Sequence, residues 1–425
     1  MSAGKDIRIG IIGLGYVGLP LARLMSQRYS TIGFDVNPQR VAALRGGTDH
    51  TGELSAEEMQ ALLARETFSL TDKIEDLSAC TTYIIAVPTP VDADNRADLT
   101  PLLHASTLVA TVLTSGNIVI YESTVYPGVT EEECVPCLER ASGLRYNADF
   151  FVGYSPERIN PGDKLHTVDT IRKVTSGSTP ETAMQVDALY RSVLKNGTCP
   201  VSSIRVAEAS KIIENTQRDV NIAFMNELAK IFNAMGIDTR EVIEAASTKW
   251  NFIPMQPGLV GGHCIGIDPY YLIQKAQVYG VMPRVISEAR RLNDGMGEYV
   301  ANQVIRLMNK KNIRVNGARI LILGFSFKEN CPDIRNTKVA DVYSSLREFT
   351  PHIHVYDPWV DSARVMEEYG VKVEKELPEG AFDAVILAVA HAGFAGLDYA
   401  RLKAARSVVY DVKGILPRTE VDGRL

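Results

Sequence analysis

Short apolar runs alternate with amphipathic stretches through the first 150 residues, a pattern typical of a parallel sheet covered by helices. We expect strands over residues 7–12, 31–35, 82–87, 117–122 and 150–153, and a helix over residues 16–27. Each expected strand ends in a turn-rich segment, which is where ligands bind in an open parallel sheet.

The same alternation returns near the C-terminus. It predicts strands over 318–324, 352–357, 384–389 and 407–411, and a helix over 339–349. In both halves a strand ending in glycine is followed by a strand ending in aspartate. The pattern therefore predicts an α/β protein with two Rossmann-like parallel-sheet domains that correspond in topology and not as a sequence repeat.

Between these halves, apolar residues recur at helical spacing from Ile204 to Met235, with Gly236 as a C-cap. The pattern predicts one long helix of roughly nine turns. Such a helix either forms a subunit interface or simply spans two domains, and both alternatives stay open. We expect an N-terminal domain over 1–202, a helical middle domain over 203–300 and a C-terminal domain over 301–425.

Composition narrows the class of protein. The chain has 425 residues, 45% of them hydrophobic and 23% charged, with a net charge of -6. No basic excess is available to neutralise phosphates, so a nucleic-acid partner is not expected. The apolar stretch from Ile9 to Met25 contains four glycines and a proline, and it reads as a strand, a turn and a helix and not as a membrane anchor or signal peptide.

Six cysteines are expected to be free thiols of a cytoplasmic protein. Cys134 and Cys137 have redox or zinc spacing, but no second pair accompanies them, so no metal site is predicted.

The first turn is a dinucleotide-binding fingerprint, Gly13-Leu14-Gly15-Tyr16-Val17-Gly18, placed between a strand and a helix. The first glycine permits the tight turn, the second lets the backbone approach a pyrophosphate, and the third permits close helix packing. Asp35 ends the next strand and is expected to accept hydrogen bonds from a ribose, which favours NAD over NADP. Arg40 is also expected among the cofactor-binding residues. It would favour NADP, but an arginine at a helix start is more often solvated.

Two further strand ends carry small polar residues, Pro88 with Thr89 and Ser123 with Thr124. Their position favours the nicotinamide end of the cofactor, although ordinary turn chemistry explains these residue types equally well.

Cys264 changes the chemistry that an NAD-dependent enzyme can perform. A thiolate can attack an aldehyde made by a first hydride transfer, and the adduct can give up a second hydride to become a thioester that water cleaves. Lys211 and Asn215 lie four residues apart on the long helix and could together stabilise an oxyanion. Asp268 is either a base or a turn residue before Pro269. His263 is not expected to pair with its neighbour Cys264, because adjacent side chains of an extended segment point apart.

A basic pair, Lys328 and Arg335, follows the first strand of the second Rossmann-like unit. This unit lacks the full glycine fingerprint, so it is not expected to bind NAD. The pair is expected to hold a phosphorylated substrate instead.

Together these motifs resemble the UDP-glucose/GDP-mannose dehydrogenase family across nearly the whole chain. The resemblance rests on residues 13–18, 87–90, 122–124, 155–157, 261–268 and 327–335, and on Lys211 with Asn215. It implies an NAD domain, a central dimerisation region and a UDP-binding domain. It also implies the four-electron oxidation of a sugar C6 hydroxymethyl to a uronate, using two NAD.

The resemblance also implies residue roles. Cys264 is the nucleophile, Lys211 and Asn215 stabilise the oxyanion, and Asp268 and Glu157 handle protons and water. Thr124 holds an ordered water. The substrate is expected to contact the residues Glu157, Arg158, Lys211, Asn215, Gly261, Lys328 and Arg335, with Lys328 also assigned to the cofactor.

Details of the motifs resemble the branch that oxidises UDP-N-acetylhexosamines for bacterial surface polysaccharides. No lysine precedes Asp268, Cys331 replaces a common threonine, and residues 155–162 read SPERINPG. The preferred epimer is left open between UDP-N-acetylglucosamine and UDP-N-acetylgalactosamine, with UDP-N-acetylmannosamine and UDP-glucose as alternatives. Two other classes are alternatives: a 6-phosphogluconate-type dehydrogenase, which needs no cysteine, and a non-catalytic nucleotide-sugar sensor.

Overall fold

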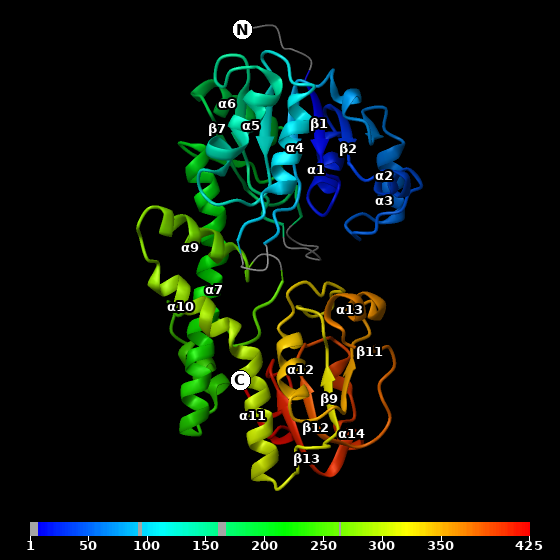
Figure 1. The fold of residues 1–425 in the computed structure, drawn as a ribbon, viewed down its shortest axis with the longest axis vertical. Coiled ribbons are helices and arrows are strands. Elements are labelled where there is room, and N and C mark those ends of the chain that lie inside the picture. The colour runs from blue at the N-terminus through cyan, green and yellow to red at the C-terminus, as the bar shows by residue number, and fades with distance from the viewer. Residues whose placement is uncertain (1–6, 92–95, 160–166, 263–264) are drawn as a thin grey trace. The chain divides into compact units, whose positions relative to one another are not determined.

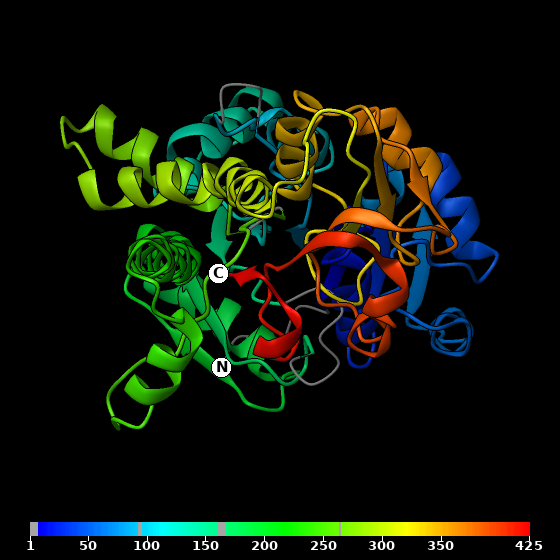
Figure 2. The same ribbon diagram turned by 90° about the horizontal axis from the view of Figure 1, so that it is seen from below.

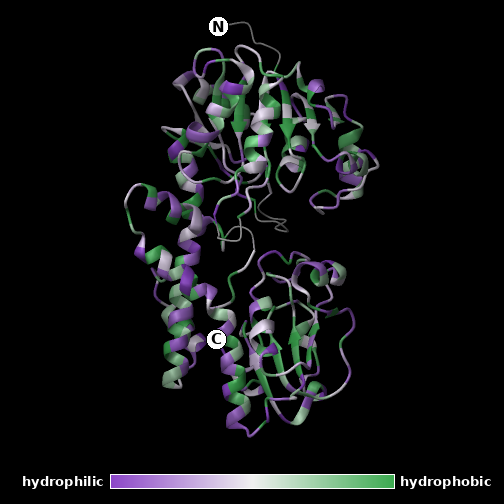
Figure 3. Cartoon of the chain, in the orientation of Figure 1, coloured by the Kyte–Doolittle hydropathy of each residue, from purple (hydrophilic) through white to green (hydrophobic). Residues whose placement is uncertain are grey.

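The computed structural model describes residues 7–91, 96–159, 167–262 and 265–425. The chain divides into two compact units, an N-terminal unit of Met1–Glu214 with Tyr270–Tyr279, and a C-terminal unit of Asn215–Pro269 with Gly280–Leu425. Each unit is built around one sheet, and apolar residues gather in the strands of both sheets (Figure 3).

The N-terminal sheet has the strand order β3-β2-β1-β4-β5-β6-β7-β8. All neighbouring strands are parallel except β6 and β7, which are antiparallel. The strands are β1 (Arg8–Ile12), β2 (Ser30–Phe34), β3 (Phe68–Thr71), β4 (Thr82–Ile85), β5 (Ile118–Tyr121), β6 (Phe151–Tyr154), β7 (Lys173–Gly177) and β8 (Thr198–Pro200).

Helices cover both faces of this sheet (Figure 1). Alternate residues of a strand enter opposite cores. Tyr83 and Ile85 pack with α4 (Thr100–Ala110) and α5 (Val135–Ser142), whereas Ile84 packs on the other face. That face is covered by α1 (Gly18–Met25), α2 (Pro38–Arg45), α3 (Ala56–Leu63) and α6 (Pro180–Arg191). Short helical turns occupy Ile74–Leu77 and Thr130–Cys134.

The C-terminal sheet has the order β11-β10-β9-β12-β13-β14 and is parallel throughout. Its strands are β9 (Ile320–Leu323), β10 (Ile353–Tyr356), β11 (Val373–Glu374), β12 (Phe382–Leu387), β13 (Lys403–Asp411) and β14 (Gly423–Arg424). On one face lie α11 (Met296–Lys310), α12 (Val339–Arg347) and α13 (Ser362–Tyr369), and on the other lie α14 (Tyr399–Leu402) and a short turn at Phe394–Gly396. The first six strand positions of both sheets follow the 3-2-1-4-5-6 order of a Rossmann fold, which confirms the predicted fold class.

One continuous helix, α7 (Ile204–Met235), runs through the boundary between the units and is seen lengthwise in Figure 1 and nearly end-on in Figure 2. The remaining helices are α8 (Thr239–Ala246), α9 (Asp268–Val278) and α10 (Arg284–Asp294), with a final short turn at Arg418–Glu420. Gly236 adopts a left-handed φ of 72° directly after α7, as predicted for its C-cap. Among the described residues, no helix has the length and apolarity needed to span a bilayer.

The first helix is shorter than predicted. It begins at Gly18 and not at Tyr16, because residues 13–17 form the turn between β1 and α1. Five strands escaped prediction, namely β3, β7, β8, β11 and β14. They are short or polar, and β7 begins with a lysine.

Candidate functional site

In the glycine turn after β1, each of the three glycines has the geometry that its predicted role requires. Gly13 has a φ of 90°, and a Cβ there would lie 2.9 Å from the carbonyl oxygen of Ala86. A Cβ on Gly18 would lie 1.8 Å from the oxygen of Gly13, so α1 packs directly on the turn. A Cβ on Gly15 would meet no atom within 4 Å. Open space at the middle glycine, in front of the start of α1, fits the pyrophosphate of a dinucleotide.

Asp35 lies beside this turn at the end of β2. Its two carboxylate oxygens each accept one main-chain N–H, from Leu14 and from Asn37, both at 2.9 Å. A carboxylate has about four acceptor positions, so two main-chain donors leave capacity for ribose hydroxyls.

The expectation that Arg40 is solvated was wrong. Its guanidinium donates to the oxygen of Leu14 at 2.8 and 3.0 Å and forms an ion pair with Asp49 at 2.7 Å, and only 12% of the side chain is exposed. Arg40 therefore stabilises the glycine turn by binding the carbonyl oxygen of Leu14, and its charge is balanced by Asp49.

The polar residues after β4 and β5 are tied to one another. Thr89 Oγ1 donates to the carbonyl oxygen of Thr124 at 2.6 Å, and Ser123 Oγ donates to that of Val87 at 2.6 Å. The hydroxyl of Tyr271 on α9 donates to the carbonyl oxygen of Thr89 at 2.5 Å. The structure thus brings the segments carrying Pro88, Thr89, Ser123 and Thr124 together at the carboxyl ends of adjacent strands, as predicted.

Glu157 follows β6 at the same edge and is 7% exposed. Its Oε1 accepts the N–H groups of Arg158 and Ile159 at 2.5 Å each, whereas its Oε2 is buried without a hydrogen-bond partner among the described residues. Arg158 is held by Glu214 of α7 at 2.7 Å and by the carbonyl oxygen of Arg172 at 2.7 Å. Glu157 rather than Arg158 therefore presents an unsatisfied polar atom.

On α7, Lys211 and Asn215 are 7% and 5% exposed and lie one turn apart, as predicted. Asn215 Nδ2 donates to Asp268 Oδ2 at 2.5 Å. Asp268 is the first residue of α9 and is 3% exposed, so it is more than a turn residue before Pro269. The amide of Asn215 thus orients a buried carboxylate.

In the C-terminal unit, the glycines of the cysteine loop pack on the segment that carries the predicted basic pair. Gly262 has a φ of 82°, its N–H donates to the oxygen of Arg335 at 3.1 Å, and a Cβ there would lie 2.7 Å from the ring of Phe327. A Cβ on Gly261 would lie 2.7 Å from the oxygen of Asn336. His263 and Cys264, the predicted nucleophile, lie outside the described residues.

Arg335 forms a two-pronged ion pair with Asp333, with its Nε 3.0 Å from both carboxylate oxygens. Lys328 directly follows Phe327, in the segment after the carboxyl end of β9. A small crevice at these strand ends is lined by residues including Gly261, Phe327, Lys338 and Lys413.

The second Rossmann turn uses its acidic residue differently. Gly324 has a φ of 91°, close to that of Gly13. Asp357, the counterpart of Asp35, accepts the N–H groups of Phe325, Ser326 and Trp359 and a hydrogen bond from His391 at 3.1 Å. Burial opposes ionisation, but the hydrogen bond from His391 and those from the main chain hold the pKa of Asp357 below its usual range. Asp357 is fully buried and already accepts four hydrogen bonds, three of them at Oδ2, whereas Asp35 accepts two.

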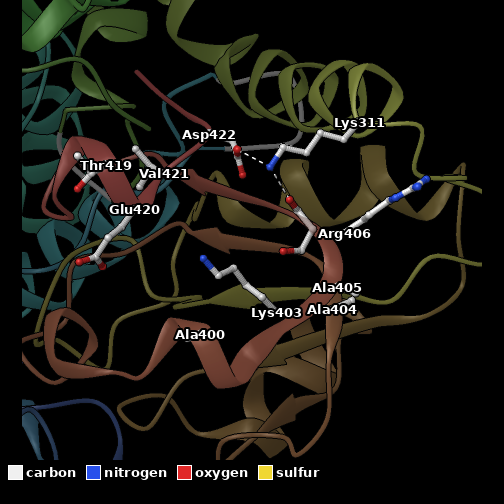
Figure 4. A pocket seen from close by; sticks show the side chains of 11 residues that line it. Lys311, Ala400, Lys403, Ala404, Ala405, Arg406, Thr419, Glu420, Val421 and Asp422 are labelled. Atoms are coloured by element: carbon white, nitrogen blue, oxygen red, sulfur yellow. Dashed lines mark hydrogen bonds and ion pairs between the residues drawn. The ribbon is translucent and has the colours of Figure 1, made fainter.

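A second cavity, of about 670 Å³, lies at the amino end of β13 in the C-terminal sheet (Figure 4). It is lined by the first residues of β13, including Lys403 and Arg406. Lys311 in its wall is paired with Asp422 at 2.5 Å and donates to the oxygen of Ser407 at 2.8 Å. Ligands of open α/β sheets bind at carboxyl ends, so this amino-end cavity is not the candidate site.

The cysteine pair at 134 and 137 is structural. Both side chains are buried, and burial raises the pKa of Cys134 to about 12, so its thiol stays protonated. No cluster of metal-binding side chains occurs in the described part of the chain.

Sequence reasoning missed several residues that hold this site. Lys173 and Tyr190 contact Glu122 behind the Glu157 turn, and Glu208 accepts the N–H groups of Gly128 and Thr130 at 2.6 and 2.9 Å. The side chain of Asn226 binds the backbone of Gly258, ahead of the cysteine loop. Its Nδ2 donates to the carbonyl oxygen of Gly258, and its Oδ1 accepts the N–H of Gly258. For Glu208 and Asn226, a charged or amide residue within the apolar pattern of α7 was the available signal, whereas Lys173 and Tyr190 offered none.

Comparison with known families gives a match along most of the chain. The NAD-binding domain of the UDP-glucose/GDP-mannose dehydrogenase family matches residues 7–194, the central domain matches 205–295 and the UDP-binding domain matches 321–418.

Individual relatives match over their full length. A UDP-N-acetyl-D-glucosamine 6-dehydrogenase from Pseudomonas aeruginosa is 55% identical, covering 99% of this chain and 100% of the relative. One from Salmonella typhi is 52% identical, covering 99% of each. Protein CapL of Staphylococcus aureus is 49% identical, covering 97% of each. Among solved structures, a UDP-D-ManNAc dehydrogenase from Pyrococcus horikoshii has a TM-score of 0.88 at 30% identity, covering 98% of each chain.

Proposed function

Because this chain belongs to the UDP-glucose/GDP-mannose dehydrogenase family, we propose that it oxidises the C6 hydroxymethyl of a UDP-N-acetylhexosamine to the carboxylate of a uronic acid. It is an NAD-dependent nucleotide-sugar dehydrogenase of polysaccharide synthesis, and NAD is its cofactor. The observation that carries the choice of sugar is the identity of 55% and 52%, over 99% of the chain, with two UDP-N-acetyl-D-glucosamine 6-dehydrogenases. UDP-N-acetylglucosamine is therefore the first substrate to test, and UDP-N-acetylgalactosamine the second.

The cofactor takes the place that the glycine turn leaves open. Gly15 offers room for the pyrophosphate, Tyr16 and Val17 complete the turn, and Asp35 retains acceptor capacity for a ribose. Bound NAD supplies a hydride acceptor at the substrate carbon.

Each oxidation removes a hydride and a proton from the C6 centre, and the chain's own residues manage the proton and the charge. Lys211 and Asn215 stabilise the negative oxygen that develops at C6. Asp268, held by Asn215 at 2.5 Å, and Glu157, with its unsatisfied Oε2, accept protons and orient water, and Thr124 holds a water at the strand ends.

Cys264 couples the two oxidations. Its thiolate adds to the C6 aldehyde to form a C–S bond, and the resulting thiohemiacetal loses a second hydride to become a thioester. Water then cleaves the C–S bond, releasing the acid and restoring the thiol. The balance is one alcohol and one water converted to one acid, with two hydrides transferred and two NADH formed.

The substrate's diphosphate is assigned to the C-terminal unit. Arg335 offers a planar fork and Lys328 a point charge beside the loop of Gly261, and Arg158 and Glu157 border the sugar. We assign three functional parts, the NAD domain at 1–202, the central helical domain at 203–300 and the UDP domain at 301–425. The five described cysteines are free thiols, which suits a cytoplasmic enzyme.

We also propose that the chain forms a homo-oligomer through α7. Five apolar side chains on this helix are between 44% and 63% exposed, namely Val206, Ile213, Phe224, Ile231 and Met235. Their successive spacings of 7, 11, 7 and 4 residues place all five on one face. A second copy of this chain, presenting the same stripe, would cover it.

The deciding experiment is the amount of NADH formed per nucleotide sugar at completion, with UDP-N-acetylglucosamine, UDP-N-acetylgalactosamine and UDP-glucose compared. We expect two NADH per N-acetylated sugar and little from UDP-glucose. Cys264→Ala should abolish uronate formation, whereas Cys199→Ala should leave it unchanged. One NADH per sugar, or uronate from the Cys264 variant, would refute the proposed chemistry.

A further inference from the structure

Behind the turn that carries Glu157 lies a buried cluster of polar side chains. Lys173, the first residue of β7, donates from Nζ to Glu122 Oε2 at 2.6 Å and to the carbonyl oxygen of Pro156 at 3.1 Å. Tyr190 of α6 donates its hydroxyl to Glu122 Oε1. Lys173, Glu122 and Tyr190 are each fully buried. Three elements of the N-terminal unit thus converge on the 155–159 turn from the side away from solvent.

Glu157 is connected to this cluster by its backbone and by its charge. Its N–H donates to the carbonyl oxygen of Glu122 at 3.2 Å. Its Oε2, the atom without a hydrogen-bond partner among the described residues, lies 3.8 Å from Lys173 Nζ. The ammonium of Lys173 therefore interacts with two carboxyl groups. It forms a hydrogen-bonded ion pair with Glu122 and a longer ion pair with Glu157.

Two buried carboxyl groups lie beside one ammonium, Glu122 in direct contact and Glu157 at 3.8 Å. Burial raises the pKa of Glu122 to about 7, with Lys173 opposing that rise and Glu157 adding to it. Glu122 therefore takes up a proton at higher pH than an ordinary carboxyl. Arg158, the residue next to Glu157, is paired with Glu214.

We propose that Lys173 is a positioning residue for the reaction: by binding Glu122 and Pro156 it fixes the 155–159 turn, and it places a positive charge 3.8 Å from Oε2 of Glu157. This inference rests on the proposed function, because it assumes that Glu157 handles a proton during catalysis. Glu122 then has a defined part as well, because it accepts a hydrogen bond from the same ammonium that binds the carbonyl oxygen of Pro156.

The test compares pH profiles of kcat for the full-length protein with saturating NAD and UDP-N-acetylglucosamine. Lys173→Met should move the acidic limb of the profile about one unit to higher pH, because a cation about 4 Å from a carboxylate has an effect of that size. Glu122→Gln should leave the acidic limb in place, because the raised pKa of Glu122 already favours its neutral form there. Lys173→Arg should restore most of the wild-type profile. A merely structural role would lower kcat in Lys173→Met without shifting the limb.

Glu157→Gln and Lys195→Met serve as references. Lys195 is an exposed lysine of the same unit, paired with Asp169 at 2.5 Å, and its removal should leave the profile in place. Loss of the limb in Glu157→Gln identifies Glu157 as its source. If the limb is lost there but unmoved in Lys173→Met, the inference is overturned while the proposed function stands.

Hydrogen exchange provides a measurement that does not depend on turnover. The amides of residues 151–159 should exchange faster in Lys173→Met than in Lys195→Met, and equal exchange would overturn the positioning role. If Lys173→Met does not fold, Lys173→Gln, which removes the charge but can still donate to Glu122, decides the question by the same shift of the limb. Absence of NADH formation by the wild type would count against the proposed function, and the exchange comparison would still decide whether Lys173 holds the turn.

Discussion

At the scale of single residues, different glycines of the first turn are needed for folding and for cofactor binding. Gly18 has no room for a side chain, whereas Gly15 faces open space. Gly18→Ala should therefore destabilise the protein by several kcal/mol, since the turn or α1 must move. Gly15→Ala should leave the melting temperature nearly unchanged but weaken NAD binding at least tenfold, because a methyl group would stand where the pyrophosphate approaches.

Thermal melting and NAD titration of both variants would check this pair. A large loss of stability in Gly15→Ala would contradict the open space described for this position.

Glu208 gives a prediction about pH. Burial raises the pKa of this carboxyl from 4.5 to about 7. A carboxyl whose pKa is raised by folding contributes stability at low pH and loses that contribution as the pH rises through its folded pKa. Relative to Glu208→Gln, the wild type should therefore lose on the order of 3 kcal/mol of unfolding free energy between pH 4.5 and 8.

Urea unfolding of both proteins across this range measures the difference. The exposed Glu227, on the same helix, offers a control, since Glu227→Gln should follow the wild type at every pH. A constant difference between the wild type and Glu208→Gln would contradict the prediction.

The roles of residues that follow from residue type alone could be predicted from the sequence. The roles of residues that depend on a partner distant in the chain could not. The roles of Gly13, Gly15 and Gly18 follow from backbone sterics alone. The contact between Asn215 and Asp268 joins positions 53 residues apart, and that between Lys173 and Glu122 joins positions 51 apart. Nothing in the local pattern specifies such partners, because they are set by which strands become neighbours in the sheet.

At the scale of elements, α7 makes the most direct prediction. If the exposed stripe from Val206 to Met235 is covered by a second copy, Phe224→Glu should convert the oligomer to monomer, because it places a charge at the centre of an apolar interface. Light scattering coupled to size-exclusion chromatography gives the mass of each variant. Glu227→Gln, which leaves the stripe intact, should remain oligomeric, and a monomeric wild type would refute the proposal.

Elements with strong periodicity were predicted well and polar ones were not. The bounds of α7 were predicted to the residue, since its apolar spacing is sustained over 32 residues and ends at a glycine. By contrast, β7 reads Lys-Val-Thr-Ser-Gly and β8 only Thr-Cys-Pro, so neither has the apolar run by which a strand is recognised. Their place in the sheet comes from pairing with β6 and with each other.

At the scale of the whole molecule, the two ligands are assigned to different units, and this division can be tested. Arg335→Ala should raise the KM for the nucleotide sugar about thirtyfold, corresponding to roughly 2 kcal/mol for a charge-assisted pair, with the Kd of NAD unchanged. Lys328 is assigned to both ligands by resemblance. The KM for the nucleotide sugar and the Kd of NAD, measured on Lys328→Ala, would show which ligand it contacts.

Arg347→Ala removes an arginine from α12 of the same unit and should change neither constant. A weaker NAD affinity in Arg335→Ala would show that the ligands are not separated in this way.

The hydrogen bonds of Asp357 have a consequence for any redesign of the second unit. The two units share a strand order, a glycine with nearly the same φ and an aspartate at the end of the next strand. In the second unit that aspartate is bonded to its own backbone and to His391. A designer who wanted this unit to bind a ribose would therefore have to release a carboxylate that is already in place, and would not need to add one.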